Sequence, residues 1–253
     1  MSRAAAIGWA RAAVSIGFVL LLELLCRTKI INPLTMIPPS AMAVKLYEIL
    51  KAGQMTDDIV QTFTTVAIAF VLSVTVGLAL GAIIHALPRV RRAVDPLLAS
   101  YYSIPFFVFY PLLIALLGLN TLPLIAIGVV FATAAMIIST LNGLDRVPRV
   151  LVKTAKIYRM SPASTVMLLT LPSAAPYLFT GLKLALAYSF IGIIAGEFIL
   201  SGGGLGFSIA YAYQNFDNDT MYALMLFVLV VVTVMNAALH MWEQRLLKRR
   251  ARA

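Results

Sequence analysis

Cysteine, histidine and charged residues are all scarce in this sequence. One cysteine, Cys26, and two histidines occur among 253 residues, and only 12% of the residues are charged. A single cysteine excludes an internal disulfide, and nothing resembling a metal-ligand set accompanies the two histidines. Ordinary soluble domains carry about 25% charged residues. The composition therefore excludes a disulfide scaffold, a disordered chain and a water-soluble globule.

Apolar residues are abundant instead. They make up 61% of the chain, and the mean hydropathy is +0.94. A fold that must cover itself with polar surface cannot reach this value, so we expect an all-α polytopic membrane protein. A spanning helix needs roughly 20 mostly apolar residues. Six segments qualify: 12–30, 62–85, 97–118, 121–141, 177–200 and 221–243.

The N-terminal third has two further features. Segment 12–30 follows Arg3 and Arg11 as the core of a signal peptide would, but no small-x-small cleavage site follows it. We expect a retained transmembrane helix. Segment 39–58 mixes apolar and charged residues after a Pro-Pro pair, which predicts an amphipathic helix at the membrane interface with Ser40 as its N-cap.

Basic residues predict the topology. The net charge is +10, and most Lys and Arg fall in short runs between the apolar segments. Positive residues favour the cytoplasmic side. Placing the N-terminus there also places the connections 86–96 and 142–176 and the C-terminal tail inside. We expect both termini in the cytoplasm of a bacterial cell, with the bilayer rather than nucleic acid as the partner of these charges.

Proline and glycine mark local features of the spans. Asp95-Pro96 predicts a helix start, and Pro105 and Pro111 interrupt the third span. Gly77 and Gly81 form a small-xxx-small face, which lets helices approach closely. Packing within the chain explains this face better than dimerisation.

The connection 142–176 is the most informative stretch, because its first half is too polar to span a membrane. Residues 150–158 predict a short helix. Ser161 then caps a second helix from Pro162, which the Leu171-Pro172 pair ends. Such a helix–break–helix with basic residues suits either docking of a cytoplasmic protein or contact with anionic lipid. The residues alone leave both open.

This connection resembles the "EAA" loop of ABC-importer permeases. Lys153-Thr-Ala-Lys-Ile-Tyr-Arg-Met-Ser161 and the later Leu171-Pro172 have its spacing, and 176–186 is similar to the next helix of the nitrate/sulfonate/taurine branch. Motifs at 37–40, 95–98, 103–113, 195–199 and 203–207 agree, so the similarity spans residues 37–247. Three positions depart from the pattern: Lys153 replaces the usual Glu, Thr154 the first Ala, and Arg159 the usual Gly.

The resemblance implies a type I ABC-importer permease that forms the pathway for a small solute in the inner membrane. It implies a second permease copy in a homodimer, two cytoplasmic ATPase subunits that bind ATP and Mg²⁺, and an extracytoplasmic solute-binding protein. This chain is then no enzyme and holds no cofactor, and its sequence has no G-x-x-x-x-G-K-[ST] phosphate loop. Relatives carry nitrate, sulfonates, taurine, aromatic acids, thiamine-precursor pyrimidines or riboflavin. The expected parts are an N-terminal helix with an extracytoplasmic segment (1–58), a permease core (59–247) and a basic tail (248–253).

Two groups of candidate site residues follow, with no catalytic and no metal-binding residue among them. The resemblance assigns contact with the ATPase to the coupling segment, residues 152–161: Val152, Lys153, Thr154, Ala155, Lys156, Ile157, Tyr158, Arg159, Met160 and Ser161. Hydroxyl and carboxyl groups in or near the spans are candidates for the solute pathway: Tyr101, Tyr102, Ser103, Tyr188, Ser189 and Glu197. Tyrosines of an interfacial aromatic belt would explain the aromatic members equally well.

Acidic residues within spans are costly and require partners. Glu23 precedes Arg27 by four residues, so an ion pair along one helix explains it. Glu197 has no basic neighbour in the sequence. It could line the pathway, gate it, or bind backbone donors of the glycine-rich run 202–206, which we expect to be a flexible loop at the outer mouth. A bare carboxylate on the pathway would disfavour an anionic solute.

Two other classes of protein compete with the permease. An autonomous ion-coupled transporter would show inverted repeats and a charge pair at the midplane, whereas the sequence offers no repeat and one unpaired candidate, Glu197. An intramembrane enzyme would need a nucleophile with its base, or a metal cluster, and no such set is recognisable.

Overall fold

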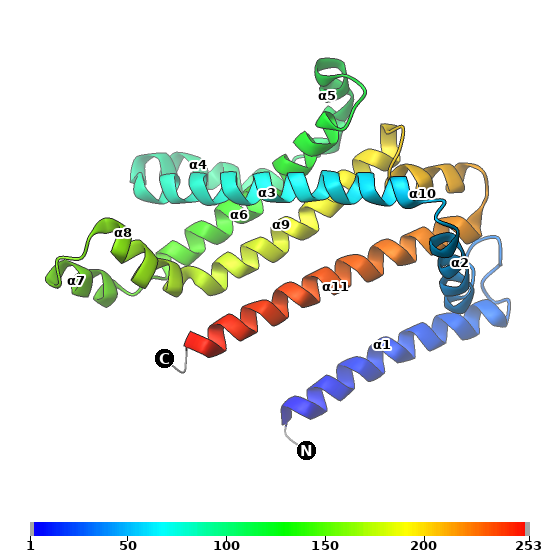
Figure 1. Ribbon diagram of the computed structural model, residues 1–253, viewed down its shortest axis with the longest axis horizontal. Coiled ribbons are helices and arrows are strands. Elements are labelled where there is room, and N and C mark those ends of the chain that lie inside the picture. Colours follow the sequence, from blue (N-terminus) through cyan, green and yellow to red (C-terminus); the bar gives the residue numbers. More distant parts are fainter. Residues whose placement is uncertain (1–2, 251–253) are drawn as a thin grey trace.

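The computed structural model describes residues 3–250, apart from the side chains at 3–8, 10–12, 102, 200 and 247–250. Throughout this range the chain forms helices and no strand (Figure 1). The helices are α1 (Arg3–Arg27), α2 (Pro39–Ala52), α3 (Thr56–Ala86), α4 (Pro88–Ser100), α5 (Tyr110–Leu117), α6 (Leu122–Asp145), α7 (Arg149–Ile157), α8 (Pro162–Thr165), α9 (Leu171–Leu200), α10 (Leu205–Gln214) and α11 (Asn218–Arg250). The all-α fold expected from the composition is confirmed.

Four helices in the described part of the chain are long and apolar enough to cross a membrane: Thr56–Ala86, Leu122–Asp145, Pro162–Ile199 and Asn218–Leu246. They coincide with the expected spans 62–85, 121–141, 177–200 and 221–243. The expected span 12–30 corresponds to helix α1, which ends at Arg27. The amphipathic helix is shorter than expected. Gly53, in the left-handed conformation with φ +68°, ends α2, and α3 begins three residues later.

The interruption expected within the third span, 97–118, is confirmed at Pro105, and this stretch is not one long helix. Pro96 lies inside α4 instead of starting a helix, and 3₁₀ turns at Tyr101–Ser103 and Phe106–Phe109 separate α4 from α5. Pro105 explains the break, because a residue before proline avoids the helical region, and Ile104 is extended with φ −83° and ψ 121°. In Figure 1, α4 lies beside α3, whereas α5 lies apart from it near the top of the view. Hydropathy averages over such a break and cannot detect it.

The expected helix end at Leu171-Pro172 is also wrong. A π-helical turn, Val166–Thr170, joins α8 to α9, so the chain is helical without interruption over Pro162–Ile199. Proline lacks an N–H and crowds the carbonyl four residues earlier. A π-turn, which widens the helix locally, accommodates Pro172 in the first turn of α9, and Pro176 follows inside the same helix.

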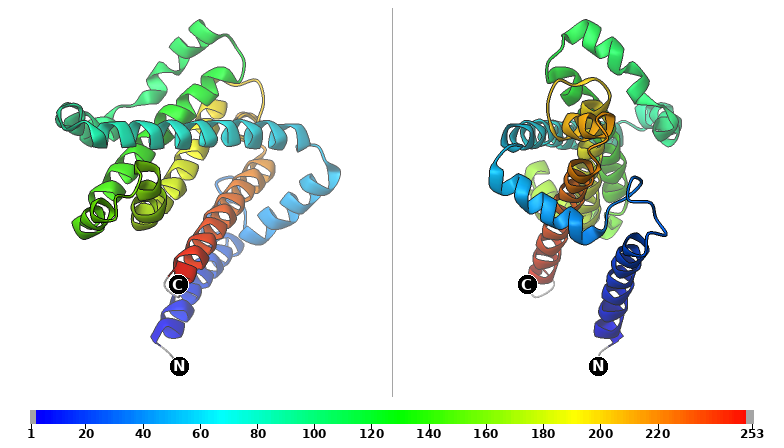
Figure 2. Two further views of the ribbon diagram at one scale, coloured as in Figure 1. Left: turned by 60° about the vertical axis from the view of Figure 1, so that its left-hand side comes forward. Right: turned by 90° about the vertical axis from the view of Figure 1, so that its right-hand side faces the viewer.

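The centre of the bundle consists of α3, α6 and α9, and the contacts of α6 with the other two are the most extensive between helices. Glycines allow the close approach. A Cβ on Gly77 would lie 2.5 Å from Met136 Cβ, and one on Gly81 would lie 2.7 Å from Thr140 Cβ. Both glycines therefore pack α3 against α6, which confirms the prediction of packing within the chain. The view in Figure 2 places both termini at its lower end and α5 at its upper end.

Candidate functional site

Helix α7 presents one side to the protein and its end to solvent. Ala155 is buried, whereas Ile157 and Tyr158 are 78% and 76% exposed. Large apolar side chains at the end of an ordered helix are typical anchors for a protein partner. The last turn of α7 therefore combines one buried residue, Ala155, with exposed apolar side chains at Ile157 and Tyr158.

The turn after α7 is a Schellman motif. The Met160 N–H donates to the Ala155 carbonyl over 2.9 Å, and the Arg159 N–H donates to the Lys156 carbonyl over 3.1 Å. Arg159 occupies the position where such motifs need a left-handed residue, with φ +49°. The left-handed conformation explains why the pattern that this loop resembles has glycine there, and Arg159 adopts it at a conformational cost.

We expect Arg159→Gly to stabilise the protein. A left-handed non-glycine residue costs roughly 1–2 kcal/mol, and the greater freedom of glycine in the unfolded chain offsets roughly 0.5–1 kcal/mol of the gain. Thermal unfolding of the purified chain in detergent measures the difference. The matched control is Lys153→Gly within helical α7, which should lose about 1 kcal/mol. Equal losses in both variants would show that contacts of the Arg159 side chain outweigh its backbone strain.

The segment after the turn starts as expected. Ser161 Oγ accepts the Ser164 N–H over 3.2 Å, and Pro162 occupies the first turn of α8. This confirms the predicted cap. Because α8 continues into α9 as one helix, a displacement of the coupling segment would be transmitted directly to a helix at the centre of the bundle.

An ion pair joins α4 to α6 at the end of the bundle where the coupling segment lies. Arg91 donates to both carboxylate oxygens of Asp145, the last residue of α6, over 2.6 Å each. Hydrogen bonding to Asp145 raises the pKa of Arg91, so the guanidinium stays charged. Such a bidentate pair fixes geometry as well as charge. It holds α4 beside the helix that precedes the coupling segment.

The candidate pathway residues do not gather at one place. The Tyr101 hydroxyl donates to the Val130 carbonyl, and Ser103 is exposed beyond α4. The side chain of Tyr102 lies outside the described residues. Tyr188 is half-buried in α9, and Ser189 beside it is buried with no hydrogen-bond partner for its hydroxyl in the described part of the chain. Tyr101 and Ser103 share one 3₁₀ turn, whereas Tyr188 and Ser189 lie on α9, and the structure brings these two groups to no common site.

Glu197 lies buried near the end of α9 and contacts α3 and α10. Thr62 Oγ1 lies 2.8 and 2.9 Å from the two carboxylate oxygens, and the Gly206 N–H donates to Oε2 over 2.9 Å. The Leu205 N–H in turn donates to Thr62 Oγ1 over 2.8 Å. Of the three roles left open for Glu197, binding of backbone donors in the glycine-rich run is the one that its contacts match.

A second carboxylate completes the cap of α10. Asp58 Oδ1 accepts the Gly204 N–H over 2.8 Å, and Oδ2 accepts the Ser208 hydroxyl over 2.5 Å. Carboxylates stabilise a helix N-terminus, where free N–H groups and the helix dipole are positive. The expectation of a flexible loop is therefore wrong for the second half of the run, because Leu205–Gln214 is a capped helix. Asp58 and Thr62 were not predicted as site residues, because nothing in the sequence marks them as neighbours of Glu197 and the α10 N-terminus.

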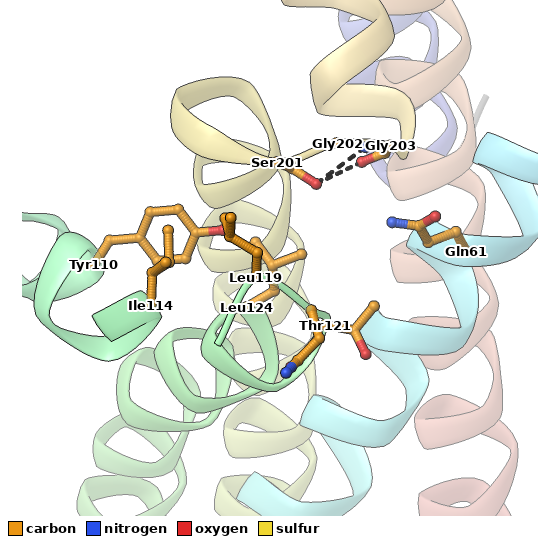
Figure 3. Close-up of a pocket in the computed structure, with 10 residues that line it drawn as sticks. Gln61, Tyr110, Ile114, Leu119, Thr121, Leu124, Ser201, Gly202 and Gly203 are labelled. Carbon is orange, nitrogen blue, oxygen red and sulfur yellow. Dashed lines mark hydrogen bonds between the residues drawn. The ribbon is translucent and has the colours of Figure 1, made fainter. Parts of the chain in front are cut away.

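Residues 201–206, from the end of α9 to the start of α10, are called the capped turn below, and a cavity of about 390 Å³ lies beside them (Figure 3). Its lining comes from the start of α3, from α5, from the α5–α6 connection and from the turn before α10. The lining residues include Gln61, Tyr110, Ser201, Gly202 and Gly203. Because α3 starts and α9 ends here, the cavity lies at the end of the bundle away from α7.

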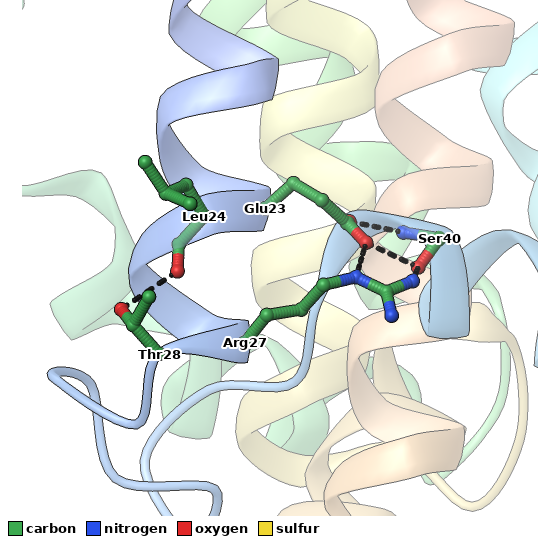
Figure 4. Close-up of polar contacts among 5 residues, drawn as sticks. All are labelled: Glu23, Leu24, Arg27, Thr28 and Ser40. Carbon is green, nitrogen blue, oxygen red and sulfur yellow. Dashed lines mark hydrogen bonds and ion pairs between the residues drawn. The ribbon is translucent and has the colours of Figure 1, made fainter.

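Glu23, the other acidic residue expected in a span, has local partners (Figure 4). It pairs with Arg27 over 2.6 Å, which confirms the predicted pair along one helix. It also accepts the Ser40 N–H over 2.9 Å and the Ser40 hydroxyl over 2.7 Å. The prediction of Ser40 as N-cap is wrong, because Pro38 holds that position and the Glu23 carboxylate takes the free donor. Glu23 thereby ties α1 to α2.

Comparisons with known proteins agree with this architecture. The family described as binding-protein-dependent transport system inner membrane component matches residues 73–252. The chain is 30% identical to the bicarbonate transport system permease protein CmpB of Synechocystis sp., over 82% of this chain and 78% of that protein. It is 30% identical to the nitrate import permease protein NrtB of Leptolyngbya laminosa over 68% of this chain, and spans 62% of that relative's length. The taurine transport system permease protein TauC of Escherichia coli is 25% identical over 86% of this chain and 81% of its own.

A solved structure shares the fold. The chain aligns with a chain of the inward-facing MetNI methionine ABC transporter with a TM-score of 0.62 and 19% identity, over 78% of this chain and 96% of that one. The helical architecture and the sequence similarities define a multi-pass permease, the translocation subunit of an ABC importer. The chain belongs to the family of binding-protein-dependent transport system inner membrane components. The resemblance to the nitrate/sulfonate/taurine branch is confirmed.

Proposed function

We propose that this permease carries a small solute that bears an oxyanion group. The support is chemical: nitrate and bicarbonate are small oxyanions, and taurine carries a sulfonate, and these solutes appear in the names of three relatives. The objection that Glu197 would repel an anion loses force, because its carboxylate contacts Thr62 and the α10 backbone. A pathway beside it does not meet a bare negative charge.

The permease works as a homodimer, and two ATPase subunits, which bind ATP and Mg²⁺, dock on the coupling segment. The observation that carries this assignment is the exposed pair Ile157 and Tyr158 at the end of α7. Buried Ala155, in the last turn of the same helix, holds that end against the protein. This chain supplies the pathway, and its partners supply ATP hydrolysis. An extracytoplasmic binding protein delivers the solute at the opposite end of the bundle.

Both termini and the coupling segment lie in the cytoplasm. Lys and Arg are concentrated in the connections near α4 and α7 and after α11, which the positive-inside rule assigns to the cytoplasm. The common position of the two termini in Figure 2 agrees with this topology.

Reconstitution in liposomes tests the proposed function. Uptake of nitrate, hydrogencarbonate or taurine should require the permease, its ATPase, its binding protein and ATP, and should be absent when any one is omitted. Liposomes that hold the purified permease alone, with a proton or sodium gradient imposed, serve as the control. Gradient-driven uptake by the permease alone would contradict the proposal and support an autonomous ion-coupled transporter.

A further inference from the structure

Two uncharged hydrogen-bonding groups face the cavity beside the capped turn (Figure 3). Tyr110 is only 2% exposed, yet its hydroxyl makes no hydrogen bond with any described residue and points toward the cavity. The side-chain amide of Gln61 also makes no hydrogen bond within the described residues, and it reaches into the cavity from α3. Both groups reach the open space of the cavity, where a ligand or ordered water can supply their hydrogen bonds.

The cavity wall carries no charged side chain among the described residues that line it. The nearby carboxylates, Glu197 and Asp58, accept hydrogen bonds from the N-terminus of α10. The positive end of that helix compensates their charge. Neutral donors in a partly open cavity suit a small group with several acceptor oxygens.

We propose that this cavity is a solute subsite, in which the Gln61 amide and the Tyr110 hydroxyl donate hydrogen bonds to an oxyanion group. This inference rests on the proposed function, which it deepens by assigning a binding site to the permease itself. The site takes the group shared by nitrate, hydrogencarbonate and a sulfonate. It lies at the end of the bundle where solute would enter.

The capped turn keeps the site in shape. Ser201, Gly202 and Gly203 form one wall, and the hydrogen bonds of Gly204, Leu205 and Gly206 to α3 and α9 side chains fix the turn. A Cβ on Gly203 would lie 2.9 Å from Gln61 Oε1, so only glycine leaves the amide in its place. A pre-formed site loses less entropy on binding than one that must be ordered first. Glu197 and Asp58 therefore act as positioning residues for the wall.

Binding to the purified permease tests the subsite without any need for ATP-driven transport. Titration calorimetry with nitrate, hydrogencarbonate and taurine as separate probes should detect binding of at least one. Gln61→Glu keeps the side-chain shape but adds a negative charge, and should weaken that binding about tenfold or more, whereas Gln61→Lys should retain or strengthen it. The matched control is Gln54→Glu, which adds the same charge on an exposed residue near the start of α3 and should leave the Kd unchanged.

Tyr110→Phe removes only the hydroxyl and should weaken binding about 2- to 10-fold. No binding of any probe, or equal losses in Gln61→Glu and Gln61→Lys, would overturn the subsite. Stronger binding in Gln61→Glu than in Gln61→Lys would overturn it as well, because a cationic solute would then be favoured. Failure of the proposed function looks different, since the unsubstituted permease would then give no ATP-dependent uptake whether or not it binds a probe.

Discussion

Replacing Ile157 and Tyr158 together by aspartate is expected to abolish solute-stimulated ATP hydrolysis in the reconstituted importer. Both side chains are largely exposed, at 78% and 76%, so the change removes little packing from the permease itself. Burying an apolar side chain of this size at an interface contributes roughly 1.5–3 kcal/mol, and a buried unpaired carboxylate reverses that gain. Loss of both anchors should reduce affinity for the ATPase by at least about 100-fold.

The measurement is ATP hydrolysis by the assembled complex with and without solute-loaded binding protein, together with pull-down of the ATPase by the permease. Ile30→Asp is a matched control, because Ile30 is 73% exposed and follows α1 in the sequence, and α1 lies apart from α7 in Figure 1. The control should couple normally, and the unfolding temperature should be unchanged in both proteins. Full solute-stimulated hydrolysis in the double variant would place the ATPase contact elsewhere on the permease.

Hydropathy and helix signals were sufficient for most of the helices. Four of the expected spans coincide with long apolar helices, because a stretch of about 20 apolar residues satisfies its backbone only as a helix in lipid. The short helix α7 and the Ser161 cap were also predictable, since their signals are local in the sequence. Arg159 was recognised as a departure from the family pattern, but its left-handed conformation needed the structure.

Two prolines within apolar stretches have different outcomes, and the sequence analysis predicted the break at Pro105 but not the continuous helix at Pro172. Pro105 ends a helix and Pro172 is absorbed by a π-turn, although the sequence presents each as a proline within an apolar stretch. Which result occurs depends on how neighbouring helices satisfy the freed backbone groups, and this is a tertiary property. A window of mean hydropathy therefore merges α4 and α5 into one span.

The candidate site was partly predictable for the same reason. Glu197 was conspicuous as a lone acid in a span, and the glycine-rich run nearby suggested backbone donors. Its side-chain partner Thr62 is 135 residues away in the sequence, and Asp58 is 146 residues from the Gly204 N–H that it accepts. A threonine near the start of an apolar helix gives no signal of such a contact. Tyr110 likewise shows its unused hydroxyl only once the cavity is formed.

The second large effect is expected from Gly192→Leu, at a point where the backbones of α6 and α9 approach closely. A Cβ on Gly192 would lie 2.8 Å from Gly128 Cα, and a backbone atom cannot move aside as a flexible side chain can. The two helices must separate, although their contact is the most extensive between helices in the described chain. Overpacking of this kind costs about 1–3 kcal/mol in soluble cores, and a backbone contact places the variant at the upper end or beyond.

Helix α9 continues from α8 and the π-turn at one end and carries Glu197 near its other end, so separation of α6 from α9 disturbs both ends of the bundle at once. We therefore expect Gly192→Leu to lower the unfolding temperature in detergent. We also expect it to abolish uptake by the folded protein that remains. Gly17→Leu in α1 is the matched control, because a Cβ there meets no atom within 4 Å, and leucine forms helices better than glycine. Unchanged stability and uptake in Gly192→Leu would mean that α6 and α9 do not approach this closely in the working permease. The coupling segment could then not act on the capped turn through a rigid pair of α6 and α9.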